Sequence, residues 1–203
     1  MAGDAMNDRR FRRWLAPLSL LAALAACNAA PAEAPPLEGA RIGGPFTLTD
    51  QNGRPFGDSQ LAGKWRIMYF GYTFCPDVCP VDMANITAGL KAFEASDPAR
   101  AAKVVPVFVT VDPERDTPAA LKQFVSNFHP RTVALTGSPE AIAAVGKAFA
   151  IFAARKEGVT PGAYLMDHSR QTYLIDGAGK PIALVPADES GEKVAETLTK
   201  WVS

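Results

Sequence analysis

Residues 65–80 read WRIMYFGYTFCPDVCP, in which a mostly apolar run leads directly into two cysteines. An apolar, aromatic-rich run of this length predicts a buried β-strand over 65–72. Cys75 and Cys79 would then project beyond the carboxyl end of that strand, where ligands collect in α/β sheets. Two sulfur atoms at such a position indicate a metal site or a redox site.

Strand and helix patterns alternate along the chain after this stretch. We expect strands at 104–111 and 131–135, and helices at 80–94, 118–128 and 139–152. Thr117 and Ser138 are suited to cap two of these helices, because a proline follows each at the first helical position. Pro106 is unusual inside a central strand and favours a bulge or an edge position.

Two hairpin signals flank this central region. Residues 46–49 precede a turn containing Asn52-Gly53, a pair that favours tight hairpins, and Asp176-Gly177 marks a second turn after the strand-like residues 172–175. A last helix is expected at 190–201. The succession predicts a thioredoxin-like α/β fold, with a central mixed sheet flanked by helices and an N-terminal β-hairpin.

The N-terminus has the pattern of an export signal. Four arginines at positions 9, 10, 12 and 13 precede an apolar stretch, 14–26, which is shorter than the ~20 residues of a bilayer-spanning helix. The last three residues of the stretch and the cysteine that follows read LAAC (24–27), which resembles a bacterial lipobox. We therefore expect a signal peptide over 1–26, a lipid on Cys27, a flexible Ala- and Pro-rich tether over 27–44, and one folded domain over 45–203.

Charge and cysteine content narrow the function further. The chain has 21 basic and 21 acidic residues and no basic block, which argues against nucleic-acid binding. It has three cysteines, so lipidation of Cys27 leaves only Cys75 and Cys79. After export such a pair oxidises unless a partner reduces it or a metal holds it. A structural disulfide is disfavoured, because so short a loop gains little closure entropy.

A histidine completes the candidate site. His168 directly precedes the expected strand at 172–175. Two thiolates and one imidazole suit Cu(I), whereas structural zinc prefers four closed ligands. Zinc with a water ligand, and thiol redox chemistry without a metal, remain alternatives. In the redox alternative, Cys75 and Cys79 form the pair of a thiol-disulfide reductase, although thioredoxins have two residues between their cysteines and this chain has three.

Other residues near these motifs receive structural interpretations. His129 is expected to interact with a helix end or lie exposed, and Asp77 to be solvated. Asp112, Arg115 and Asp116 are expected to form an internally paired turn. The methionines at 68, 83 and 166 are interpreted as core residues, and Asp167 is considered as a group that orients His168.

Three motifs together resemble the SCO/SenC family: GYTFCPDVCP (71–80), VDPERD (111–116) and DHS (167–169). The resemblance covers the whole exported domain. It implies a thioredoxin-like, membrane-tethered protein on the outer face of an energy-transducing membrane, with copper held as Cu(I), or alternatively Cu(II). Carried onto this chain, the implied metal ligands are Cys75, Cys79 and His168.

The resemblance also implies partners and a location. Copper would pass by ligand exchange, without enzymatic turnover, to the CuA site of cytochrome c oxidase subunit II or to another cuproprotein. A reductase acting on the CuA cysteines is the alternative. A periplasmic thiol reductant would supply electrons to the cysteine pair, or a copper donor would supply the metal. The lipid on Cys27 would hold the chain at the periplasmic face of a bacterial membrane.

Overall fold

The computed structural model describes residues 33–159 and 163–203. The predicted signal peptide and the lipidation site at Cys27 lie outside these residues. The domain treated below is the compact unit Pro35–Ser203. Within the described ranges, no helix is both long enough and apolar enough to cross a membrane.

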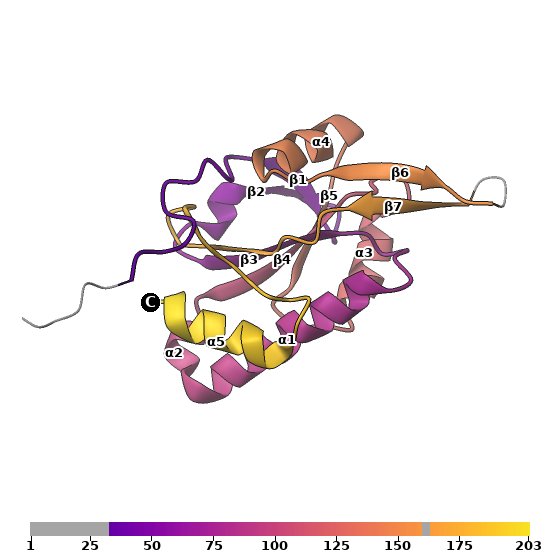
Figure 1. The fold of residues 1–203 in the computed structure, drawn as a ribbon. Coiled ribbons are helices and arrows are strands. Elements are labelled where there is room, and N and C mark those ends of the chain that lie inside the picture. Colours follow the sequence, from indigo (N-terminus) through magenta and orange to yellow (C-terminus); the bar gives the residue numbers. More distant parts are fainter. Residues whose placement is uncertain (1–32, 160–162) are drawn as a thin grey trace, which may run out of the picture. The chain divides into compact units, whose positions relative to one another are not determined.

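A seven-stranded mixed sheet forms the centre of this unit, with strand order β2-β1-β5-β4-β3-β8-β9 (Figure 1). The inner strands β3, β4 and β5 are parallel, and the strands on either side pair antiparallel. The strands are β1 (Thr47–Asp50), β2 (Pro55–Gly57), β3 (Trp65–Gly71), β4 (Val104–Thr110), β5 (Val133–Thr136), β8 (Tyr173–Ile175) and β9 (Pro181–Leu184). Every residue of β3 is buried, as expected for a parallel strand covered on both faces.

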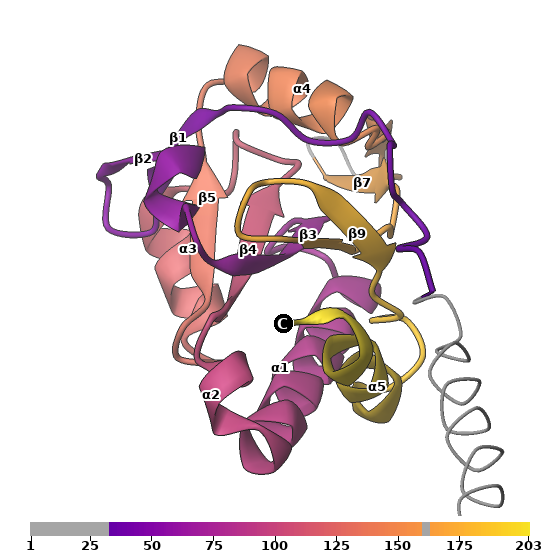
Figure 2. The same cartoon turned by 90° about the vertical axis from the view of Figure 1, so that its left-hand side faces the viewer.

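Helices cover both faces of the sheet. Figure 2 shows α4 on one side of the sheet and α1 and α5 on the other. The helices are α1 (Val78–Ser96), α2 (Pro98–Ala101), α3 (Pro118–Val125), α4 (Pro139–Ala148) and α5 (Gly191–Trp201), with a short 3₁₀ helix, η2 (Asp58–Leu61). The predicted caps are confirmed, because Thr117 Oγ1 accepts from the N–H of Ala120 and Ser138 Oγ from that of Ala141.

Helices α1 and α5 approach each other closely at one glycine. A Cβ added at Gly89 would lie 2.5 Å from the Cβ of Val194 and 2.7 Å from the carbonyl oxygen of Gly191. Gly89 is therefore required by the packing of the two helices, and this contact holds α1 against the C-terminal helix.

A separate two-stranded sheet was not predicted. It consists of β6 (Ala153–Glu157) and β7 (Tyr164–His168), which pair antiparallel with each other and with no strand of the main sheet among the described residues. In Figure 1 this hairpin projects from the end of the main sheet. The sequence pattern missed β6 because four of its five residues are exposed and it has no apolar face.

Several helix boundaries differ from the prediction. Helix α1 begins at Val78, two residues early, because Pro80 falls in the first turn, where a proline is tolerated. Helix α4 ends at Ala148 and not at 152, and Ala150 has a positive φ of 52°. Helix α3 ends at Val125, three residues early.

Pro106 is neither at a bulge nor on an edge strand. It pairs in regular register with Ile67 of β3, inside the central strand β4. Strand β5 pairs with β4 only from Val107 to Val109, so Pro106 precedes the stretch bonded to β5. A missing N–H is tolerated there because, in the part of the chain that the structure describes, no residue of β5 pairs with Pro106.

The packed domain begins earlier than the sequence pattern predicts. The N–H of Leu37 donates to the carbonyl of Ile182 in β9, and the N–H of Gly43 donates to the carbonyl of Ala148 in α4. Leu37 and Ile42 also pack against the core. Residues 35–44 therefore belong to the folded unit, and the predicted tether is shorter than 27–44.

Candidate metal centre

The two cysteines lie at the junction between β3 and α1. Cys75 occupies the turn after β3, where its N–H donates to the carbonyl of Tyr72 at 3.3 Å, and its side chain is partly exposed. Cys79 is the second residue of α1 and has no exposed surface. Its N–H lies 3.4 Å from the sulfur of Cys75. The turn and the helix start thus bring both thiols together, as the sequence predicts.

His168 reaches the same place from the end of β7. Its Nε2 lies 3.4 Å from the sulfur of Cys79, although the two residues are 89 positions apart. Its Nδ1 lies 2.8 Å from the carbonyl oxygen of Ser169, which can only accept, so Nδ1 carries the proton. This hydrogen bond leaves the lone pair of Nε2 facing Cys79, the tautomer that a metal ligand needs. Ser169, and not Asp167, therefore orients the ring.

The three donors are adjacent but have not converged on one point. Within 33–159 and 163–203, no group of three or more His, Cys, Asp or Glu side chains has the arrangement of a metal site. Cys79 nevertheless contacts both Cys75 and His168. The donor types suit a soft ion such as Cu(I), so the chemistry of the set fits copper. Binding would require Cys75 and His168 to turn toward a common centre with Cys79.

Burial determines the protonation states at this site. It raises the pKa of the Cys79 thiol to about 12, so this thiol is neutral at pH 7 when no metal is bound. Burial, with Cys79 and Asp82 nearby, also raises the pKa of Tyr69. A metal ion must therefore displace a proton from Cys79 as it binds.

The imidazole of His168 gives a test of burial at this site. Burial lowers its pKa, so below the unfolded-state pKa of about 6.5 the unfolded chain binds more protons at this residue than the folded chain. The stability contributed by neutral His168 is therefore complete above about pH 6.5 and is lost as the pH falls through the folded-state pKa. In metal-free protein, we expect acidification below about pH 6.5 to lower the unfolding free energy of the wild type more than that of His168→Gln. Denaturant titrations at several pH values measure this difference, and a constant difference would contradict the prediction.

Glycine at the end of β3 makes room for Cys79. A Cβ at Gly71 would lie 2.9 Å from the sulfur of Cys79 and 2.7 Å from the ring of Tyr69. Both distances are shorter than atoms can tolerate without movement. Gly71 therefore allows the buried sulfur to lie directly against the strand.

A buried carboxylate fixes the loop that precedes Cys75. Asp116 has no exposed surface and accepts hydrogen bonds from the N–H of Thr73 at 3.0 Å, from Thr73 Oγ1 at 2.6 Å and from Thr110 Oγ1 at 2.6 Å. Burial raises the pKa of Asp116, although these hydrogen bonds favour the charged form. Asp116 joins the loop after β4 to the cysteine loop, so it does more than pair within its own turn.

Arg115 links the same loop to the hairpin. Its Nε donates to Asp112 at 2.5 Å, which confirms the predicted internal pair, and its Nη1 donates to the carbonyl of Tyr164 in β7 at 3.0 Å. The guanidinium also stacks over the rings of Tyr164 and Phe74, at 3.5 Å and 4.8 Å from their centroids. Because Phe74 is next to Cys75, Arg115 contacts both sides of the candidate site.

The remaining sequence candidates do not join the site. His129 is buried and not exposed, and its Nε2 lies 3.2 Å from Glu94 on α1. Asp77 is exposed, and its side chain makes no capping hydrogen bond to α1. Met68 and Met83 are buried core residues, as predicted.

Three residues that support the site were not singled out from the sequence. Asp82, Tyr69 and Arg170 form a hydrogen-bonded group next to Cys79 and His168. Asp82 could have been noticed, because it lies three residues after Cys79 and therefore on the same face of the helix. A charged residue among buried apolar neighbours indicates a specific partner.

A cavity of about 520 Å³ in the domain is distinct from the metal centre. It lies between α4 and the hairpin, and none of the three candidate ligands lines it. Met166, two residues before His168 on β7, is one of its lining residues. The cavity is thus a neighbour of the site on the same strand.

Comparison with known proteins identifies the family. The SCO1/SenC family model matches residues 34–203. An SCO2-like protein of Rickettsia prowazekii is 40% identical over 157 residues, which are 77% of this chain and 75% of that protein. Mitochondrial SCO2 of Saccharomyces cerevisiae is 39% identical over 166 residues, 79% of this chain. The match spans about half, 54%, of the yeast protein's own length.

Solved structures agree with these matches. The solved structure of copper-bound ScoI of Bradyrhizobium japonicum has 40% identity and a TM-score of 0.70, and the match covers 79% of this chain and 99% of the chain in that structure. The thioredoxin domain of a Bacteroides vulgatus thiol-disulfide oxidoreductase shows the fold alone, with 16% identity and a TM-score of 0.52 over 80% of this chain and 96% of that domain. The predicted thioredoxin-like fold is therefore confirmed. By its sequence, its fold and the placement of its three motifs, the chain belongs to the SCO1/SenC family.

Proposed function

We propose that this chain is an exported, membrane-tethered copper chaperone that holds copper through Cys75, Cys79 and His168. The observation that carries the proposal is the contact between the buried sulfur of Cys79 and Nε2 of His168, with Cys75 adjacent. Copper is supported by the softness of these donors and by the copper-bound relative. Export and lipidation at Cys27 rest on the sequence pattern alone.

Delivery by ligand exchange agrees with the unequal exposure of the donors. Cys79 is fully buried, whereas Cys75 is partly exposed in a turn. An incoming thiolate from a cuproprotein would therefore meet copper on the Cys75 side while Cys79 and His168 still hold it. Three-coordinate copper leaves space for such an additional ligand. The recipient we propose, on the family resemblance, is the CuA site of cytochrome c oxidase subunit II.

The same asymmetry supports a second function as a thiol-disulfide reductase. The Cys75 thiolate would attack a disulfide of a partner, forming a mixed disulfide and releasing one partner thiolate. The neutral Cys79 thiol would then attack the Cys75 sulfur and pass its proton to the departing partner sulfur, which releases the second partner thiol and leaves a Cys75–Cys79 disulfide. Two electrons pass to the partner, and an external dithiol reductant must restore the pair.

A copper titration distinguishes the two functions. The reduced full-length chain in detergent is titrated with Cu(I) under anaerobic conditions against a competing chelator, beside His168→Ala. We expect tight one-to-one binding by the wild type and its loss in the variant, because the imidazole is one of only three ligands. His168→Ala should leave disulfide reduction largely intact. Weak binding by the wild type, or binding indifferent to His168, would contradict the chaperone function.

A further inference from the structure

We propose that Arg170 and Asp82 form an ion-pair clamp that positions His168 against Cys79. The proposal rests on the proposed function, since it assigns a positioning role beside the copper ligands. Arg170 lies two residues after His168, and Asp82 lies three residues after Cys79 on α1. The pair therefore joins the two chain segments that carry the imidazole and the buried thiol.

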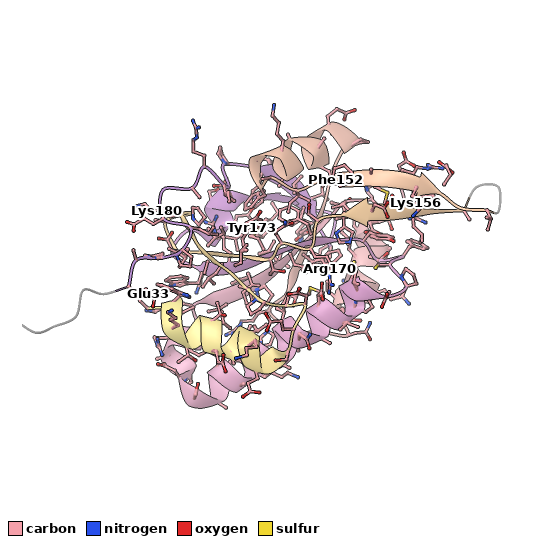
Figure 3. All side chains as sticks on the ribbon, in the orientation of Figure 1. Glu33, Phe152, Lys156, Arg170, Tyr173 and Lys180 are labelled. Carbon is pink, nitrogen blue, oxygen red and sulfur yellow. The ribbon has the colours of Figure 1, made fainter. Side chains whose placement is uncertain are left out.

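The geometry of the pair is bidentate. Nη2 of Arg170 donates to Oδ1 of Asp82 at 2.6 Å, and its Nε lies 3.3 Å from Oδ2. Tyr69 of β3 donates its hydroxyl to the same Oδ2 at 3.0 Å. Figure 3 labels Arg170, whose side chain points toward α1. A two-point contact of this kind fixes both the distance and the orientation of the loop.

The burial of Asp82 makes the ion pair sensitive to the position of the segment that follows His168 and carries Arg170. The Asp82 side chain has no exposed surface, whereas 40% of the Arg170 side chain is exposed. If the loop moved away, Asp82 would remain as an uncompensated buried charge, which is strongly unfavourable. The carboxylate on α1 therefore holds the arginine, and with it the segment that follows His168.

The hairpin needs such an attachment because of its topology. Within 33–159 and 163–203, strand β7 pairs only with β6, so the ladder of the main sheet does not fix His168. The bonds between Ser169 and Phe152 connect the two arms of the hairpin to each other and not to α1. The other end of β7 is held at Tyr164 by Arg115. Arg170 supplies the corresponding attachment at the histidine end.

The test separates positioning from folding with a paired variant. In Arg170→Met/Asp82→Asn, no charge is left unpaired, and the asparagine oxygen can still accept from Tyr69. Arg100→Met is the matched control, because it breaks an Arg–Asp pair of the same 2.6 Å bond length just beyond the far end of α1. Thermal unfolding checks that both variants fold.

Two readouts follow the position of His168. Cu(I) affinity of the full-length chain should fall roughly tenfold in the paired variant and stay unchanged in the control. In the His168→Ala background the paired variant should cause no further loss, because there is no imidazole to position. In metal-free Cys75→Ser protein, alkylation of Cys79 should become about tenfold faster when the clamp is removed.

Each outcome decides the proposal. The clamp is supported if the paired variant lowers copper affinity only when His168 is present and also speeds the alkylation of Cys79. Unchanged alkylation in the folded paired variant overturns it, and so does an equal loss of copper affinity with and without His168. If the wild type itself fails to bind Cu(I), the proposed function fails, while the alkylation rates still decide whether the clamp holds the loop over Cys79.

Discussion

Cys79→Ser is expected to weaken Cu(I) binding by more than about a hundredfold. Removing a residue that only hydrogen-bonds to a metal ligand already costs up to about a hundredfold in metal affinity, and Cys79 is itself a proposed ligand. The sulfur of Cys79 is the donor that contacts both of the others. A serine hydroxyl is harder than a thiolate and does not ionise near neutral pH, so it cannot replace this ligand for Cu(I). Titration of the reduced full-length variant against a competing chelator measures the loss.

Met83→Leu is the matched control for this experiment. Met83 also carries sulfur, lies one turn along α1 from Cys79, and is 1% exposed in the core. The exchange conserves volume, so the fold should persist and copper affinity should not change. Wild-type affinity in Cys79→Ser, or a comparable loss in Met83→Leu, would show that the assignment of ligands is wrong.

Asp116→Ala is expected to lower the free energy of unfolding by about 3 kcal/mol. The buried carboxylate accepts from the backbone and hydroxyl of the half-buried Thr73 and from the hydroxyl of the buried Thr110. Alanine leaves these donors without their acceptor and frees the loop that leads to Cys75. Copper affinity should therefore also fall, by roughly tenfold.

Two comparisons give this second prediction its specificity. Asp116→Asn keeps one carbonyl oxygen and should lose only about half as much stability. Asp77→Ala removes an exposed carboxylate of the cysteine loop that makes no capping bond, and should change stability by less than about 0.5 kcal/mol. Denaturant unfolding measures all three variants. Equal losses for Asp116→Ala and Asp77→Ala would mean that the hydrogen bonds of Asp116 do not anchor the loop.

Local patterns predicted much of the fold because local forces produce them. The buried run at 65–72 forms β3, and the Thr-Pro and Ser-Pro pairs cap α3 and α4 as expected. Apolar periodicity and helix caps act between residues close in the chain, so a single sequence displays them. The end of α4 was misplaced because apolar residues continue past Ala148 into a turn at Ala150.

The hairpin β6–β7 shows where local patterns fail. Strand β6 has no buried face and pairs with β7, which Arg115 in turn contacts at Tyr164. None of these contributions leaves an apolar pattern in the sequence. His168 was correctly predicted to lie near the two cysteines, but its neighbours in the chain do not indicate that its ring would contact Cys79 in particular.

Local sequence patterns established the α/β class, the central strand, the capped helices and the family motifs with their two thiols and one histidine. The groups that surround these features became apparent only in the folded chain, where Asp116 is bonded to Thr73 across 43 residues and Arg170 to Asp82 across 88. The partner of a buried charge is selected by the packing of distant segments. No periodicity or spacing along the chain records that choice.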